Sequence, residues 1–165
     1  MFKLRLLSSV LFCCLLLVCS GSSFAQSPEA ITESDVVALL NSVDKAAIKK
    51  NLAGMLAPLA SDVKIKLAVS AQGSDKEEVA HLNKEQYAYH TKRALRLRYT
   101  YTVDRKNTRV KLYDDKKTAM VTSELYETVT TARGKLRAVS SETSVVTLRD
   151  GKLLFILIET RMRFY

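Results

Sequence analysis

The hydrophobic pattern of this chain changes its period near residue 98, and that change limits the architectures open to it. Before that point, apolar residues recur every three or four positions over residues 32–50 and 83–97, which predicts two amphipathic helices. After it, apolar and polar residues alternate, which predicts a run of strands. Helices followed by strands are typical of an α+β domain, with helices packed on the concave face of a curved antiparallel sheet.

Capping signals mark where each of the two helices begins. Thr32 and Asp35 have the spacing of a capping box, and so do Asn83 and Gln86. Between the two helices we expect a shorter helix over 52–59, a strand over 62–69 and a polar loop over 70–82.

The first 25 residues have the pattern of a secretory signal peptide. A basic start is followed by an apolar run over 6–19, and small residues precede a cleavage point after Ala25. The run is shorter than the roughly 20 residues that span a bilayer. The alternatives are an uncleaved anchor and a lipoprotein joined through Cys19. We therefore divide the chain into a signal peptide (1–25), a flexible arm (26–32) and one domain (33–165), and we expect no membrane span in the mature chain.

All three cysteines lie in this leader, at positions 13, 14 and 19. A mature chain without cysteine has no disulfide, no thiolate nucleophile and no cysteine metal site. The two histidines, His81 and His90, lack the spacing of a metal-binding helix, and the chain has no glycine-rich phosphate or dinucleotide motif. The sequence therefore predicts neither a metal nor a cofactor.

Short phrases at four places resemble the nuclear transport factor 2-like superfamily, which includes ketosteroid isomerase and scytalone dehydratase. They are residues 52–59 (LAGMLAPL), 61–63 (SDV), 117–123 (KTAMVTS) and 142–154, which contains the turn LRDGKLL. The resemblance covers about residues 33–162. It implies a cone-shaped α+β fold, a pocket between helices and sheet, and often a dimer through the other sheet face. The catalytic residues of the enzymatic members match no position here, so none is carried over.

The dipeptide Asp150-Gly151 is the strongest hairpin signal, because a mirror-image two-residue turn needs positive φ at both positions. A two-residue turn there places Glu142 opposite Glu159 on one face, with Arg161 beside them. These acids either share a proton or bind a cation, or else they form a salt-bridge network with Arg161.

A second two-residue turn at Arg133-Gly134 adds Glu127 to the same face, opposite Ser140. We assign that face to the concavity, and the threonine-rich opposite face to a homodimer interface.

Two residues of the helix over 83–97 are further candidates for the pocket. His90 is expected to face the sheet, either as a buried neutral imidazole bonded to a tyrosine or as a ligand contact. Tyr87 could line a cavity or simply pack in the core.

Residues 92–117 contain ten basic and three acidic side chains. They could bind an anionic surface or form a solvated strand, and nucleic acid is the least expected partner for an exported chain.

Three functions remain open. The first is a non-enzymatic binding or accessory module for a small organic ligand. The second is a small lyase or isomerase that uses the pocket carboxylates. The third is a structural component of an envelope complex.

Overall fold

A computed structural model describes residues 30–73 and 76–165, and it has the predicted α+β architecture. Within these residues, three helices and six strands follow one another: α1 (Glu33–Ile48), α2 (Leu52–Leu56), β1 (Leu59–Ser70), β2 (Glu77–Leu82), α3 (Lys84–Leu95), β3 (Thr100–Leu112), β4 (Thr118–Thr131), β5 (Gly134–Arg149) and β6 (Lys152–Phe164). The signal peptide predicted over 1–25 lies outside the described residues.

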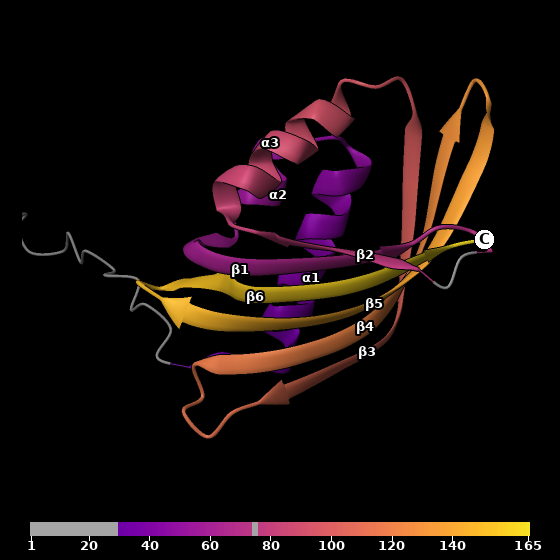
Figure 1. Cartoon of the computed structure of the whole chain (residues 1–165). Helices are drawn as coiled ribbons and strands as arrows, with labels where there is room; N and C mark the ends of the chain where they lie inside the picture. The colour runs from indigo at the N-terminus through magenta and orange to yellow at the C-terminus, as the bar shows by residue number, and fades with distance from the viewer. Residues whose placement is uncertain (1–29, 74–75) are drawn as a thin grey trace, which may run out of the picture.

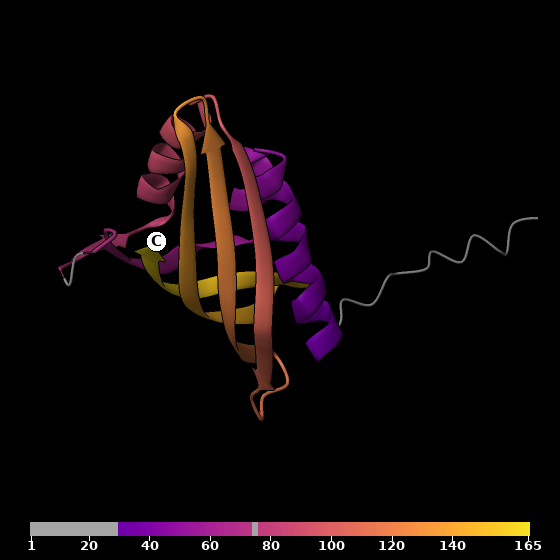
Figure 2. The ribbon, with the colours of Figure 1, turned by 90° about the vertical axis from the view of Figure 1, so that its right-hand side faces the viewer.

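The six strands form one sheet in the order β2-β1-β6-β5-β4-β3. Strand β1 runs parallel to β6, and every other neighbouring pair is antiparallel. The sheet curls strongly, and the helices lie within its concave side (Figures 1 and 2). Strands β2 and β3 are therefore the two edges of the sheet.

Both predicted capping boxes are present. The Thr32 hydroxyl accepts a hydrogen bond from the Asp35 amide, and the Asn83 side chain accepts one from the Gln86 amide. Each pair satisfies two amides that the first helical turn leaves free. Residue Ile31, which the sequence analysis placed in a flexible arm, is buried, and its amide donates to the Lys116 carbonyl at 2.8 Å.

Two segments between the main helices differ from expectation. The second helix ends at Leu56, and β1 begins at Leu59, three residues earlier than predicted. The expected loop over 70–82 contains strand β2, which pairs with β1 from Glu77 to Leu82. Residues 77–81 of β2 are exposed, so the strand has no buried side to give it a period-two pattern.

The core lies between α1 and the concave face of the sheet. Val36 and Leu40 of α1 are almost fully buried against Val121 of β4 and Val146 of β5. Phe155 of β6 is also buried in this cluster.

The hairpin between β5 and β6 has the predicted turn, with φ of 50° at Asp150 and 71° at Gly151. Its register follows the prediction from Arg149 opposite Lys152 to Val146 opposite Phe155. A β-bulge then inserts one residue into β6, so that Val145 pairs with Leu157.

This bulge overturns the predicted pairing of the two glutamates. Glu142 lies opposite Thr160, and Glu159 lies opposite Thr143. A shift of one residue exchanges the two faces of a strand. Glu142 therefore points into the concavity, whereas Glu159 and Arg161 point outward.

The hairpin between β4 and β5 differs in a milder way. Thr131 pairs with Gly134, so the loop is Ala132–Arg133 rather than Arg133–Gly134. Glu127 consequently lies opposite Ala138 instead of Ser140. A two-residue shift leaves each side chain on its predicted face, and Glu127 and Glu142 still share the concave face.

Among the described residues, no helix is both long enough and apolar enough to cross a membrane.

Candidate functional site

A guanidinium group from the edge strand β3 lies on the concave side of the sheet, over β4 and β5. Arg105 lies on β3 directly opposite Leu125 of β4, which is buried. The alternation of β3 brings Tyr101, Val103 and Arg105 to the same side of the strand. Only 10% of the Arg105 side chain is exposed, so its charge requires partners.

Three protein groups surround this guanidinium. Nε and Nη2 donate to the two carboxylate oxygens of Asp44 on α1, both at 2.9 Å. Nη1 donates to Glu142 Oε1 at 2.8 Å and to Ser123 Oγ at 2.6 Å. These four residues, Asp44, Arg105, Ser123 and Glu142, are called the Arg105 cluster below. The cluster joins the longest helix to three strands of the sheet.

Electrostatics keep the Arg105 guanidinium charged. Burial by itself would lower the pKa of Arg105, but the hydrogen bonds that it donates to Asp44 and the charge of Glu142 outweigh burial, and the pKa lies above its usual value. The two carboxylates have 17% and 16% of their side-chain area exposed. A bidentate arginine–carboxylate pair in such a place is both strong and directional.

A second polar group lies further along the same face. Tyr101 donates from its hydroxyl to Glu127 Oε1 at 2.7 Å, and Ser140 donates to Glu127 Oε2 at 2.6 Å. Burial and the negative charge of Glu127 raise the pKa of Tyr101 above its ordinary value. Burial also raises the pKa of Tyr87 on α3, with a further contribution from Glu142 and Glu127. Both tyrosines therefore remain neutral donors at physiological pH.

The cavity between helices and sheet is small. It measures about 100 Å³ and touches Tyr87, Arg105 and Glu142 on its polar side. The rest of its lining is mainly apolar: Val43, Met55, Leu59, Ile65, Leu67, Phe155 and Ile158, together with Thr160. For comparison, an engineered apolar cavity of about 150 Å³ binds one benzene molecule. The interior therefore has room for only a few non-hydrogen atoms.

The structure separates the predicted site residues into two groups. Glu127, Glu142 and Tyr87 lie on the inner side, as expected. Glu159 and Arg161 lie on the outer face, where Arg161 Nε forms an exposed ion pair with Glu77 at 2.8 Å. Neither the shared proton between Glu142 and Glu159 nor the network with Arg161 is compatible with this placement.

The prediction for His90 is also wrong in its geometry. Its side chain is exposed instead of buried against the sheet, and its ring meets the edge of Tyr89 with centroids 5.5 Å apart. The less exposed side of α3 carries Ala88, Thr91 and Leu95, with Tyr87 at one margin. His90 lies roughly 110° round the helix from the centre of that side, so it points away from the cavity.

Sequence reasoning missed Arg105 and Asp44. The signal for Arg105 was its place in the alternation that begins at Tyr101 and Val103, which puts a cation among inward-facing residues. Because Arg105 also belongs to the basic stretch over 92–117, it was grouped with the exposed cations and its inward-facing position was overlooked. Asp44 follows Val43 of the apolar stripe on α1, so it was available as the counter-charge.

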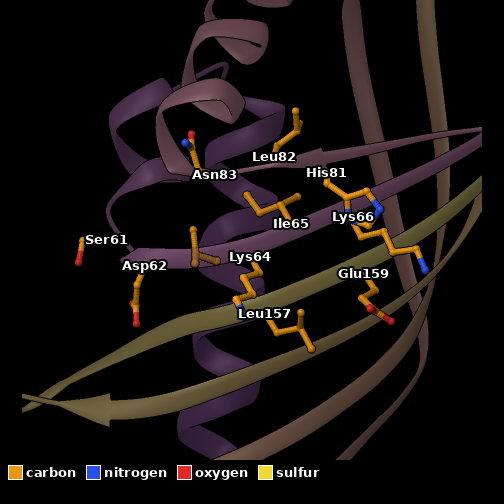
Figure 3. A pocket seen from close by; sticks show the side chains of 11 residues that line it. Ser61, Asp62, Lys64, Ile65, Lys66, His81, Leu82, Asn83, Leu157 and Glu159 are labelled. Atoms are coloured by element: carbon orange, nitrogen blue, oxygen red, sulfur yellow. The ribbon is translucent and has the colours of Figure 1, made fainter.

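The outer face of the sheet has larger hollows than the interior. A groove of about 480 Å³ runs beside β1 and β2, with Lys64, Lys66, His81, Leu157 and Glu159 on its walls (Figure 3). Two further hollows, of about 260 and 490 Å³, lie over Thr143 and its neighbours on the central strands. Within the described residues, no group of three histidine, cysteine or acidic side chains could hold a metal ion.

The strand order, the curled sheet and the helices on its concave side define a cone-shaped α+β fold. In comparisons of the sequence, no family model and no curated protein matches this chain. Solved structures do match it.

A putative scytalone dehydratase from Novosphingobium aromaticivorans is similar with a TM-score of 0.63 and 12% identity, over 77% of this chain and 80% of that one. An NTF2-like protein of unknown function from Pseudomonas putida has a TM-score of 0.59 and 14% identity, over 78% and 84%. A hexachlorocyclohexane dehydrochlorinase from Novosphingobium barchaimii has a TM-score of 0.59 and 13% identity, over the same shares.

These likenesses confirm the predicted fold: the chain has the nuclear transport factor 2-like, scytalone dehydratase-like architecture. At such identities they establish the fold alone, because proteins that share it include enzymes as well as proteins without a known activity.

Proposed function

We propose that this protein is an exported accessory module without catalytic activity, and that it acts by presenting the outer face of its sheet to a protein partner. The observation that carries the proposal is the size of the interior cavity. Its 100 Å³ falls below the roughly 300–1,000 Å³ of ordinary ligand and cofactor pockets.

The state of the interior charges supports the same conclusion. Arg105, the group best suited to hold an anionic ligand, already has Asp44, Glu142 and Ser123 as partners. Both oxygens of Glu127 accept hydrogen bonds from the protein. A general base needs a free lone pair aimed at its substrate. The protein contacts use both oxygens of Asp44 and Glu127 and one oxygen of Glu142, which leaves little capacity for that role.

The partner that we expect first is a second copy of this chain. An apolar row crosses the outer face where Val145 of β5 pairs with Met120 of β4 and Leu157 of β6. All three side chains are only half-buried. Rows of threonine flank them, with Thr122 beside Thr143. Central strands that expose apolar and hydroxyl groups in this way are suited to a symmetric, self-complementary interface.

The oligomeric state tests this proposal. Light scattering after size-exclusion chromatography should give the mass of a dimer for the parent protein. Leu157→Glu should give a monomer, because a dimer of this variant would bury one carboxylate from each copy in the interface. Val37→Glu is the matched control, since Val37 is 39% exposed on a helix away from that face. A monomeric parent protein, or an equal effect of the control, would refute the proposal.

Export is tested by the intact mass of the protein recovered from the cell envelope of a bacterial host. Loss of residues 1–25 supports cleavage after Ala25. A full-length chain held in the membrane supports the anchor, and a lipid adduct on Cys19 supports the lipoprotein alternative.

The second candidate is a small lyase or isomerase, which the neighbours named as a dehydratase and a dehydrochlorinase favour. Glu142 lines the cavity and would be the acid–base residue. Native mass spectrometry of protein from its source should then show a retained small molecule, and Glu142→Gln should release it without unfolding the chain. A mass without any adduct favours the accessory role.

A further inference from the structure

Two segments at one end of the molecule have the same three-residue sequence of cation, leucine, cation: the first is a loop, and the second lies at the start of β5. Residues 96–98 are Arg-Leu-Arg, after α3, and residues 135–137 are Lys-Leu-Arg, after the β4–β5 turn. Leu97 is 67% exposed and Leu136 is 48% exposed, and all four flanking cations are exposed as well. Leu97 is therefore held in solvent in the loop between α3 and β3. On β5, successive side chains alternate, so Leu136 lies on the concave side of the strand and Lys135 and Arg137 lie on its outer side.

The fold brings these two segments to the same end. Thr100, at the start of β3, pairs with Thr130 near the end of β4, and Thr130 pairs with Lys135. Lys50 at the end of α1 donates to the Leu97 carbonyl at 3.3 Å, which fixes the first loop against the helices. Figures 1 and 2 both place the end of α3, the start of β3 and the β4–β5 turn together. We call this surface, formed by residues 89–98 and 133–137, the rim.

The positive charge of the chain concentrates at the rim. Residues 86–103 contain four Lys and Arg, and residues 128–141 contain three, which makes seven, and neither stretch contains an Asp or Glu. The formal net charge of the whole chain is +9. No salt bridge in residues 30–73 and 76–165 neutralises any of these seven. The rim therefore presents an uncompensated positive field.

A third apolar group adds to the pattern. Tyr89 on α3 is 59% exposed, and the Arg93 guanidinium lies 5.7 Å from its ring centroid. Tyrosine and arginine together are suited to the boundary between lipid headgroups and acyl chains, where one part of the side chain meets apolar and another meets polar surroundings.

We propose that the rim docks on the surface of an anionic phospholipid bilayer. Its cations meet the lipid phosphates, and Leu97 and Leu136 enter the layer just beneath them. A soluble polyanion would engage the cations but offers nothing to the two exposed leucines, whereas a bilayer engages both. This proposal goes beyond the accessory role and does not require the dimer, and of the outer sheet face it uses only the end that carries Lys135 and Arg137.

Vesicle flotation with the full chain tests the proposal. Vesicles of phosphatidylcholine with about one third phosphatidylglycerol should bind the protein at least about tenfold more tightly than pure phosphatidylcholine. Binding to anionic vesicles is compared with binding to pure phosphatidylcholine vesicles because the apolar leader, residues 6–19, could insert into either kind of bilayer. Arg98→Gln combined with Lys135→Gln should weaken binding to the anionic vesicles by about tenfold or more, since each cation near such a surface contributes about fivefold.

The matched control removes two cations at the opposite end. Lys111 lies near the end of β3 and Lys117 just before β4, beside the β3–β4 turn in Figure 1, and both side chains are exposed. The double variant Lys111→Gln with Lys117→Gln should change binding by less than about twofold. Circular dichroism should show that both double variants are folded. Equal losses from rim and control pairs, or no preference for anionic vesicles, would overturn the proposal.

Leucine variants separate a bilayer from a soluble polyanion. Leu97→Ser with Leu136→Ser should lower vesicle binding, most clearly in high salt, and leave retention on a heparin column unchanged. If the serine variant binds vesicles as the parent does, only electrostatics is at work and the docking geometry is wrong.

Discussion

Replacing Arg105 by methionine tests the central claim about the interior. Methionine keeps much of the volume of the arginine stem but removes the charge that Asp44 and Glu142 share. Four hydrogen bonds disappear, and two carboxylates with only 17% and 16% exposed area remain without a counter-charge. Removing one partner of a buried ion pair costs about 3–5 kcal/mol. For a domain of this size, that loss lowers the melting temperature by roughly 10–15 °C.

Urea denaturation of the parent and the variant measures this change. The midpoint should fall while the slope of unfolding free energy against urea stays the same, because the folded surface is similar. Arg161→Met is the matched control, since it removes a guanidinium from an ion pair whose arginine side chain is 72% exposed. Its cost should lie below about 1 kcal/mol.

A compensating variant makes the test specific to charge. Adding Asp44→Asn and Glu142→Gln to Arg105→Met removes the two stranded negative charges and keeps their shapes. This triple variant should recover at least half of the lost stability, because the penalty arises mainly from unpaired buried charge. An Arg105→Met variant that loses less than about 1 kcal/mol, or a triple variant less stable than the single one, would refute the electrostatic reasoning.

Three further predictions concern the tyrosine, the bulge and the cap of α3. The pKa of Tyr101 is raised in the folded protein. Its contribution to the unfolding free energy is therefore complete below about pH 10 and declines above that pH, because the hydroxyl then loses its proton in the unfolded chain but keeps it in the folded one. Tyr101→Phe should flatten the alkaline limb of unfolding free energy against pH, and an unchanged limb would contradict the assignment. In a chain whose three leader cysteines are serines, Thr143→Cys with Glu159→Cys should form a disulfide in mild oxidant, whereas Glu142→Cys with Glu159→Cys should not; the reverse result would restore the register without a bulge. Asn83→Ala should lower the unfolding free energy by about 1 kcal/mol in urea melts, and no loss would mean that the capping box is not formed.

Local signals in the sequence were sufficient for the elements and the fold class. Thr32 and Asn83 mark the helix starts because their side chains satisfy amides that the helix itself cannot. The turn at Asp150-Gly151 was predictable because few residues other than these adopt positive φ at low cost. These interactions span only a few residues, so each can be recognised without knowledge of the rest of the chain.

The bulge in β6 could not be predicted in this way. Residues 153–158 are Leu-Leu-Phe-Ile-Leu-Ile, an unbroken apolar run in which no alternation shows which side chains face inward. The turn sets the register for the first four pairs, and only packing in the curled sheet decides where one residue is inserted. The error was confined to residues beyond the bulge, which include Glu159 and Arg161.

That single inserted residue connects the closed interior to the outer surface. Without it, Glu159 would join Glu127 and Glu142 on the concave face, which Asp44 of α1 also approaches, and one guanidinium would have to balance four largely buried carboxylates. With it, Glu159 lies in solvent, and Leu157 moves from the core side to the outer face. There Leu157 completes the row with Val145 and Met120. The same backbone feature thus limits the charge that the interior must neutralise and supplies the apolar centre of the proposed interface.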